Sequence, residues 1–377
     1  MLEQQKISNG ENSLIRQKAF LLQWHITERC NWRCRHCYQE GNKVSPDLSL
    51  KQLFQIFDKF LSLIQKREIP SQRVTLNITG GEPLLRKDFF QFIERIGQHS
   101  HLFRWGLMSN GSLLNKDNIL ELKKAGIWRC QVSLEGLEKN NDKIRGKGSF
   151  RKTIRAIRLL ANEGVPVRVS LTLTRENMKD IPVLTKLCAK LGVSALGTRR
   201  LIPWGRGKEL AKYMLQPQEL RNFYLKVKEI NAKLAKGKNE LKVILGCESG
   251  IFSDELIFDT KSNMGANFCG VTQGRGLTIM ANGDILPCRR LPIVVGNALK
   301  EDFDDVYYSP KMQELRDLDK LHPFCQECAN FLNCFGGAKC INYTYAGKLN
   351  VPDVQCWRAY KKIGQPRFTS TGRNSNR

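Results

Sequence analysis

The sequence lacks any long apolar run. No stretch of its 377 residues approaches the roughly 18–20 uncharged apolar residues that a membrane-spanning helix requires. Residues 1–18 are polar and charged and contain no apolar segment followed by a small-residue cleavage site, as a secretory signal would. These absences argue against a membrane role and predict a cytoplasmic protein.

Acidic residues are scarce relative to basic ones. The chain has 61 Lys and Arg against 36 Asp and Glu, a formal net charge of +25. Such an excess is consistent with a solvated basic surface. It also suits the binding of an acidic electron donor, such as a ferredoxin or flavodoxin, or of an acidic substrate. No recognisable nucleic-acid-binding module accompanies the charge, so nucleic acid is not an expected partner.

Between residues 20 and 236 the sequence alternates short apolar runs with amphipathic stretches. The expected strands are 19–26, 73–78, 103–108, 128–134, 167–173 and 193–201. The expected helices are 48–66, 87–98, 116–125, 150–163, 179–190 and 218–235. Such alternation predicts a parallel sheet with helical crossovers. About six units are fewer than the eight of a closed barrel, so we expect an α/β fold with an open, partial (β/α)6 TIM-like barrel.

The pattern changes after a lysine-rich break at 236–238. From Cys247 to Cys356 the periodicity weakens and eight of the thirteen cysteines accumulate. We expect a small domain there, held by metal rather than by a large apolar core. The predicted division is an N-terminal extension (1–19), the barrel (20–236), a cysteine-rich domain (240–360) and a basic, disordered tail (361–377).

The cysteines of a long chain without a secretory signal indicate metal binding rather than disulfides. Cys30, Cys34 and Cys37 follow the first expected strand, at the end of a parallel sheet where active sites collect. Three thiolates so close together can hold three irons of a [4Fe–4S] cluster and leave the fourth iron without a protein ligand. A zinc site with His36 as its fourth ligand would use the same spacing.

A glycine-rich turn, Gly80-Gly81-Glu82-Pro83, closes the second expected strand. Two glycines let the backbone approach a ligand closely, and a glutamate can accept a hydrogen bond from an ammonium group. Because this turn comes one strand after the cysteine triad, the two features together favour iron–sulfur chemistry over zinc.

With these motifs the sequence resembles the radical S-adenosylmethionine (radical SAM) superfamily, in particular the branch with a C-terminal SPASM domain, over about residues 20–360. That branch includes peptide and protein maturases and haem-pathway decarboxylases. The resemblance implies that S-adenosylmethionine is cleaved reductively to a 5′-deoxyadenosyl radical, which takes a hydrogen atom from the substrate. It also implies that Cys30, Cys34 and Cys37 ligate the first cluster. The implied contacts to S-adenosylmethionine come from His36, Gly80, Gly81, Glu82, Ser109, Asn110, Ser133 and Arg145.

The same resemblance assigns the C-terminal cysteines to two auxiliary [4Fe–4S] clusters, which makes three clusters in all. The nearer cluster would use Cys247, Cys269, Cys288 and Cys340, and the farther one Cys325, Cys328, Cys334 and Cys356. Cys247 lies farther upstream than in relatives, and without it the nearer cluster keeps an open iron. Two zinc sites of four thiolates each would use the same residues. Cys130 and Cys188 are expected to pack as small buried hydrophobes.

The substrate is less clearly specified than the chemistry. Sulfatase-maturing relatives carry an aspartate directly after the position of Cys288, where this chain has Arg289 and Arg290. The change argues against formylglycine formation and suits a substrate carboxylate. We favour maturation of a peptide or protein. The alternatives are oxidative decarboxylation of a haem or porphyrin precursor, maturation of a metal-cofactor oxidoreductase and, in a different class, a non-catalytic zinc protein. No residue is assigned as a catalytic acid or base.

Overall fold

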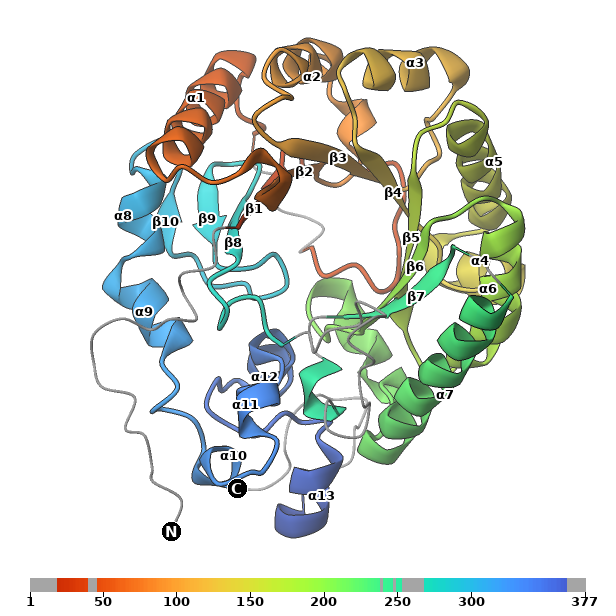
Figure 1. The fold of residues 1–377 in the computed structure, drawn as a ribbon, viewed down its shortest axis with the longest axis vertical. Coiled ribbons are helices and arrows are strands. Elements are labelled where there is room, and N and C mark those ends of the chain that lie inside the picture. The colour runs from red at the N-terminus through yellow and green to blue at the C-terminus, as the bar shows by residue number, and fades with distance from the viewer. Residues whose placement is uncertain (1–18, 40–45, 238–239, 247–248, 253–267, 365–377) are drawn as a thin grey trace.

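The computed structural model describes residues 19–39, 46–237, 240–246, 249–252 and 268–364. Six parallel strands form the centre of one curved sheet: β1 (Phe20–His25), β2 (Val74–Thr79), β3 (Arg104–Ser109), β4 (Arg129–Ser133), β5 (Val167–Leu173) and β6 (Ala195–Arg200). Helices cover the outer face of this sheet (Figure 1): α1 (Leu50–Lys66), α2 (Phe89–Gly97), α3 (Lys116–Lys124), α5 (Ser149–Asn162), α6 (Ile181–Lys190) and α7 (Pro217–Lys236). The predicted α/β partial barrel is confirmed.

The sheet extends beyond the six predicted strands at both edges. Its order in the described residues is β10-β9-β8-β1-β2-β3-β4-β5-β6-β7. The added strands are β7 (Lys242–Leu245), β8 (Gly276–Ile279), β9 (Asp284–Leu286) and β10 (Gly296–Asn297). β7 and β8 run parallel to β6 and β1, whereas β9 and β10 continue antiparallel. The sheet therefore crosses the predicted boundary near residue 240, and the division into domains stays a prediction.

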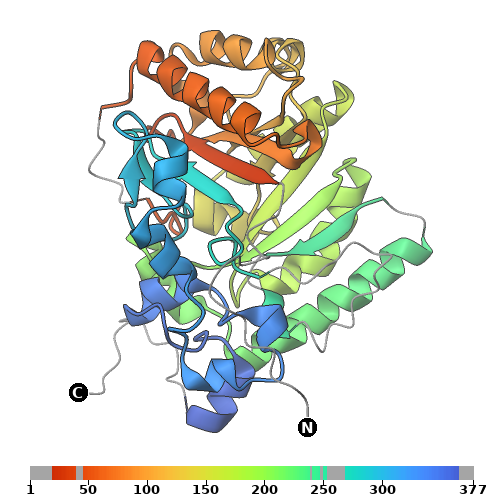
Figure 2. The ribbon, with the colours of Figure 1, turned by 60° about the vertical axis from the view of Figure 1, so that its left-hand side comes forward.

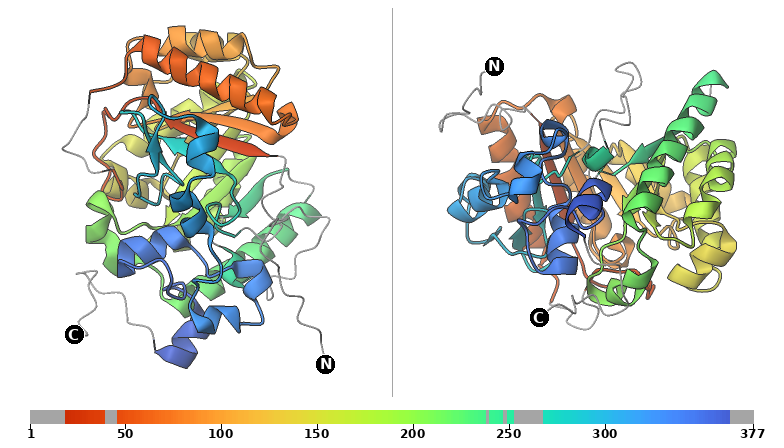
Figure 3. Two further views of the ribbon diagram at one scale, coloured as in Figure 1. Left: turned by 90° about the vertical axis from the view of Figure 1, so that its left-hand side faces the viewer. Right: turned by 90° about the horizontal axis from the view of Figure 1, so that it is seen from below.

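Short helices make up most of the chain after β10. They are α8 (Phe303–Tyr307), α9 (Pro310–Arg316), α10 (Pro323–Gln326), α11 (Phe331–Cys334), α12 (Lys339–Ala346) and α13 (Trp357–Ile363). Helices α10 to α13 gather at the end of the molecule opposite α1 and α2 (Figures 2 and 3). Residues 361–363 of the predicted tail belong to α13, Gly364 ends this helix, and residues 365–377 lie outside the described residues. No helix in the described part of the chain has the length and apolar character needed to cross a membrane.

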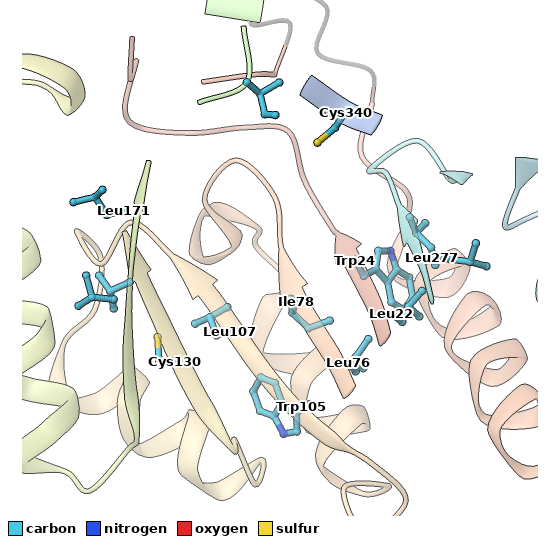
Figure 4. Close-up of a cluster of buried hydrophobic side chains, with 14 of the residues drawn as sticks. Leu22, Trp24, Leu76, Ile78, Trp105, Leu107, Cys130, Leu171, Leu277 and Cys340 are labelled. Atoms are coloured by element: carbon cyan, nitrogen blue, oxygen red, sulfur yellow. The ribbon is translucent and has the colours of Figure 1, made fainter. Parts of the chain in front are cut away.

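The alternation of side chains along each strand separates the apolar core from the barrel interior. Trp24, Ile78 and Trp105 point to the outer face, where the helices cover them (Figure 4). The Trp24 ring meets Phe92 of α2 edge-on at 5.1 Å. Each fully buried aromatic or aliphatic side chain of this kind stabilises the fold by about 1.5–3 kcal/mol. Cys130 lies in the same layer without exposure. The positions of opposite parity face the barrel interior.

Candidate active site

A cavity of about 400 Å³ lies at the C-terminal ends of the parallel strands. This volume falls within the range of small-molecule sites. Nearly all the residues predicted to bind the first cluster or S-adenosylmethionine line the cavity: Cys30, Cys34, His36, Cys37, Gly80, Gly81, Ser109, Asn110, Ser133 and Arg145. Glu82 is the exception. The structure thus brings together segments that are separated by more than a hundred positions in the sequence.

The two glycines of the turn after β2 approach the loop that carries the cysteine triad. A Cβ atom on Gly80 would collide with the carbonyl oxygen of Thr27, and one on Gly81 with that of Arg29. The Gly81 N–H donates to the Thr27 carbonyl at 2.8 Å. The glycines were expected to let the backbone approach a ligand, but the contact that requires them here is with the β1 loop. They fix that loop, and with it Cys30, against β2.

Glu82 lies behind the cavity wall and is fully buried. Its carboxylate accepts hydrogen bonds from the Ser109 hydroxyl at 2.9 and 3.0 Å and from the Asn110 N–H at 2.8 Å. Burial raises the pKa of Glu82 to about 7, although these hydrogen bonds act to lower it. Glu82 was expected to accept from an ammonium group of the cofactor. In the structure it joins the ends of β2 and β3, and its contact with the cofactor stays a prediction.

Two cysteine sulfurs of the triad have N–H groups within reach. The Asn110 side-chain amide lies 3.9 Å from the Cys30 Sγ, and a guanidinium nitrogen of Arg145 lies 3.8 Å from the Cys34 Sγ. Burial raises the pKa of both thiols, and the neighbouring thiols of the triad add to the effect. Grouped thiols with raised pKa values become thiolates when a metal centre binds. Donors to their sulfurs are a feature of iron–sulfur sites.

Glu135 holds Arg145 and His36 in place. Its buried carboxylate receives the Arg145 side chain at 2.5 and 3.0 Å, the His36 Nε2 at 3.2 Å and the Thr172 N–H at 2.6 Å. Burial alone would raise the pKa of Glu135, but the proximity of His36 and Arg145 and the hydrogen bonds lower it to about 2. Glu135 thus connects His36 of the cysteine loop to Arg145.

Helix α4 (Glu138–Arg145), which the sequence analysis did not predict, carries Arg145 into the cavity. Asn141 accepts the Glu135 N–H at 2.9 Å, and Asp142 accepts the N–H of Phe150 at 2.8 Å at the start of α5. These two residues therefore stabilise the helix and loop that present Arg145, and they lie outside the cavity lining.

Arginines are the main charged residues of the cavity lining. The described lining holds eight arginines but only two glutamates, Glu28 and Glu135. The Arg289 guanidinium lies 4.7 Å from the centre of the Tyr38 ring, and its buried Nε has no hydrogen-bond partner among the described residues. Arg200 has a different role, because a bidentate ion pair with Asp353 at 2.8 Å engages it. Arg289 therefore has a donor in the cavity lining that can bind an anionic ligand.

The four thiols predicted for the farther auxiliary cluster line one small second cavity: Cys325, Cys328, Cys334 and Cys356. Burial raises the pKa of Cys325 to about 12 and that of Cys356 to about 11, and neighbouring acidic groups add to both shifts. Cys288 belongs to the nearer set. Burial raises the pKa of its thiol, and the neighbouring Cys269 thiol raises it further. Cys340 is buried in α12. Cys247 lies outside the described residues.

Comparisons with known proteins agree with this geometry. The profile of the radical SAM superfamily matches residues 24–188, and that of SPASM, an iron–sulfur cluster-binding domain, matches residues 269–329. The AdoMet-dependent heme synthase of Oleidesulfovibrio alaskensis is 26% identical over 350 residues, covering 89% of this chain and 86% of that protein. The mycofactocin maturase MftC of Mycolicibacterium smegmatis is 28% identical over 346 residues, covering 89% and 82%. The chain therefore carries a radical SAM domain followed by a SPASM domain.

A solved structure supports the fold of this radical SAM enzyme. The structure of anSMEcpe with bound AdoMet and the Cp18Cys peptide superimposes with a TM-score of 0.72 at 18% identity, over 91% of this chain and 95% of that one. The cofactors of the enzyme are [4Fe–4S] clusters and S-adenosylmethionine. The grouped thiols and the N–H donors around Cys30 and Cys34 fit a cluster at the first site. The assignment of individual ligands stays a prediction.

Several residues of the cavity were missed by the sequence analysis. Glu135, Gln131, Ser170 and Thr172 line the cavity but are not among the residues that the sequence predicts for it. The available signal was parity: Gln131 is two positions before Ser133 on the same strand, so both side chains face the barrel interior. Cys130 and Cys188 are fully buried, as predicted.

Proposed function

We propose that this radical SAM enzyme matures a peptide or protein by removing a hydrogen atom next to a carboxylate, and that Arg289 binds that carboxylate. The observation that carries the proposal is the buried guanidinium of Arg289, which lines the cavity with an unpartnered donor. A buried cation of this kind is costly unless an anion pairs with it, and a guanidinium matches a carboxylate in a bidentate fashion. The name of the relative MftC, a maturase, supports the peptide class.

The chain's own residues would have distinct tasks in this reaction. When bound, the first cluster and S-adenosylmethionine supply the electron and the radical. Cys30, Cys34 and Cys37 would hold the cluster, while Asn110 and Arg145 direct N–H groups at its thiolates. Arg145, kept in place by Glu135, would also contact S-adenosylmethionine. Tyr38 and Arg289 would hold the substrate.

The farther thiol cavity supports a second part of the proposal, electron exchange with an acidic protein such as a ferredoxin or flavodoxin. Helix α13 begins directly after Cys356. The Trp357 ring lies within 5.2 Å of the cations of Arg221, Arg358 and Lys361. An auxiliary cluster at Cys325, Cys328, Cys334 and Cys356 would thus lie beside a basic surface suited to an acidic donor.

A second candidate substrate is a haem precursor with propionate groups. The cavity wall of arginines suits propionates as well as peptide carboxylates, and the relative from Oleidesulfovibrio alaskensis is named a heme synthase. Incubation of the reduced enzyme with deuterium-labelled peptide or porphyrin separates the two. Label that moves from a peptide into 5′-deoxyadenosine supports the proposal. Label that moves only from a porphyrin propionate contradicts it in favour of the second candidate.

The role of Arg289 has its own test. Arg289→Gln should raise the KM for the substrate by about 10-fold or more, since a charged hydrogen-bonded pair loses one partner. Arg289→Lys should restore part of the loss because the charge remains without the bidentate fork. Substrate-independent cleavage of S-adenosylmethionine, measured in both variants, shows whether the first cluster site is intact. An unchanged KM in Arg289→Gln would assign carboxylate binding to another residue.

A further inference from the structure

Three arginines lie near the N-terminal ends of the strands, away from the cysteine triad; Arg104 is exposed, and the other two are partly buried. Arg104 and Arg129 are the first residues of β3 and β4, and Arg168 is the second residue of β5. We call these three residues the arginine staircase. None of the roles described above uses them, and none of them lines the cavity.

Side-chain parity determines the direction in which the staircase faces. Ser170 and Thr172 of β5 line the cavity, whereas Leu171 between them is buried on the helix side. Arg168 has the same parity as these two residues and therefore points into the barrel. On β4, Gln131 lines the cavity, and Arg129 lies two positions before it.

Strand register places the three arginines on a diagonal. Arg129 pairs with Gly106, two positions after Arg104, and Arg168 pairs with Gln131, two positions after Arg129. Each step to the next strand therefore moves two residues toward the C-terminal ends. Because strands in a barrel tilt and are staggered, such a diagonal follows the inside wall.

The diagonal continues toward the active site. Arg199 of β6 pairs with Thr172, further along the same wall, and lines the cavity. Beneath it, the Arg168 side chain passes over Gly197 of β6, where a Cβ would lie 3.7 Å from the Arg168 Nε. The Arg168 side chain therefore contacts β6 inside the barrel.

The staircase is a concentration of like charge without a counter-charge. Among the described residues, no carboxylate forms an ion pair with Arg104, Arg129 or Arg168. Burial lowers the pKa of Arg168 to about 10, and the charges of Arg129 and Arg199 contribute. Burial and then Arg104 lower the pKa of Arg129 in the same way. Partly desolvated guanidinium groups that repel one another are offset most directly by a bound anion.

An aromatic side chain marks the outer end of the staircase. Trp128 precedes β4 and is 37% exposed. The guanidinium carbons of Arg129 and Arg104 lie 4.2 and 5.0 Å from the centre of the Trp128 ring. The contacts orient two of the three cations, and they make Trp128 a natural optical reporter of any change at the site.

We propose that the arginine staircase is an anion-binding site for a ligand that carries several carboxylate or phosphate groups. The spacing of cations over three neighbouring strands suits a ligand with two or three negative groups rather than one. The site is separate from the carboxylate site at Arg289 and does not depend on the substrate proposed above. Carboxylate and phosphate share the chemistry that a guanidinium fork recognises, so the probes are chosen to distinguish them.

The test uses the cluster-containing enzyme under anaerobic conditions at constant ionic strength. Tricarballylate represents the carboxylates and inorganic pyrophosphate represents phosphate. Binding is followed by calorimetry and by tryptophan fluorescence. We expect the wild-type enzyme to bind one of the probes saturably with a change in emission. Trp128→Phe should lose the optical change and keep the calorimetric signal.

The deciding variant is the double substitution Arg129→Gln and Arg168→Gln. It should bind the preferred probe at least 10-fold more weakly than the wild-type enzyme does. A matched control, Arg155→Gln with Arg158→Gln, removes the same charge from exposed positions of α5 and should bind as the wild type does. Removal of mutual repulsion should leave the melting temperature of the staircase variant unchanged or higher, which checks that it folds.

Two results would overturn the proposal. One is the absence of saturable binding of both probes to the wild-type enzyme. The other is equal weakening in the staircase variant and in the α5 control, which would indicate a response to net charge alone. Preference for tricarballylate assigns the site to a polycarboxylate, and preference for pyrophosphate assigns it to a phosphate-bearing ligand. Because binding is measured without turnover, these results are independent of the hydrogen-transfer test.

Discussion

Arg145 connects Glu135 to Cys34: its guanidinium forms an ion pair with the Glu135 carboxylate and lies 3.8 Å from the Cys34 Sγ. The carboxylate is not in the cluster-binding triad, yet it sets the position of a donor to one of the triad's sulfurs. Residues that orient the ligands of a metal centre in this way affect its function nearly as much as the ligands themselves.

Glu135→Gln should therefore slow the formation of 5′-deoxyadenosine by about 10- to 100-fold, the usual cost of losing such a supporting group. The rate is measured with dithionite as reductant, beside iron content. Glu138→Gln changes an exposed carboxylate of α4 that pairs with Arg151; it is the matched control and should retain full activity. A Glu135→Gln rate close to that of the control would show that Arg145 needs no anchor.

Gly81→Ala should displace the loop that carries Cys30, because the added Cβ would collide with the backbone of Glu28 and Arg29. Overpacking of this kind costs about 1–3 kcal/mol, and loss of the first cluster would remove about four irons per chain. Iron analysis and melting temperature check both effects. Gly237→Ala, where a Cβ meets only ordinary contacts at 3.6 Å, should keep its iron. Full iron content in Gly81→Ala would contradict the role given to the glycine turn.

Cys334→Ser should lose an auxiliary cluster and keep the first one, since Cys334 lines the second cavity only. We expect about four fewer irons per chain with continued, substrate-independent cleavage of S-adenosylmethionine. Cys188→Ser is the control: it changes a buried thiol of α6 and should leave the iron content unaltered. Equal iron in Cys334→Ser and wild-type enzyme would remove Cys334 from the predicted ligands.

Lys361→Glu with Lys362→Glu should weaken reduction by an acidic protein donor. Both lysines are exposed on α13, and charge reversal at the rim of an interface mainly lowers the association rate. Flavodoxin-supported cleavage of S-adenosylmethionine should fall by roughly 10-fold at low salt, whereas the dithionite-supported rate stays the same. The same reversal at Lys123 and Lys124 on α3 should have little effect. Equal losses in the two double variants would point to net charge rather than a docking surface.

The pH dependence of stability should reveal Glu82. Its folded-state pKa is raised to about 7, so the folded protein binds a proton there more tightly than the unfolded chain does. Its stabilising contribution is present below about pH 4.5 and is lost as the pH rises to 7. Glu82→Gln lacks this decline. Between pH 5 and pH 7.5 the melting temperature of the wild type should therefore fall relative to that of Glu82→Gln. A difference between the two melting temperatures that stays constant with pH would contradict a raised pKa.

The sequence predicts the six central strands because their apolar runs are continuous and the intervening helices have clear amphipathic faces. It does not predict β7 to β10, because these strands are two to four residues long and follow or lie within a region where glycine and cysteine hide any period. Helix α4 was missed for a similar reason, since only Asn141 and Ile144 are buried in it.

The candidate site, like the fold, could be predicted from the sequence only in part. Cysteine spacing and the glycine turn identify the residues that meet in the cavity, because those residues follow consecutive parallel strands. The roles of Glu82 and Glu135 depend on contacts between segments far apart in the chain: Glu82 with Ser109, and Glu135 with Thr172. No local pattern records such a contact.

The pairing of β8 with β1 has a practical consequence. Leu21 to Trp24 of the first strand pair with residues 276–279, and Arg67, directly after α1, forms an ion pair with Asp304 of α8. A chain cut after α7 would therefore leave one side of β1 as an open strand edge, which invites aggregation. The cysteine-rich segment cannot be removed as a detachable module, and an attempt to make a minimal radical-generating fragment of this protein should yield insoluble material.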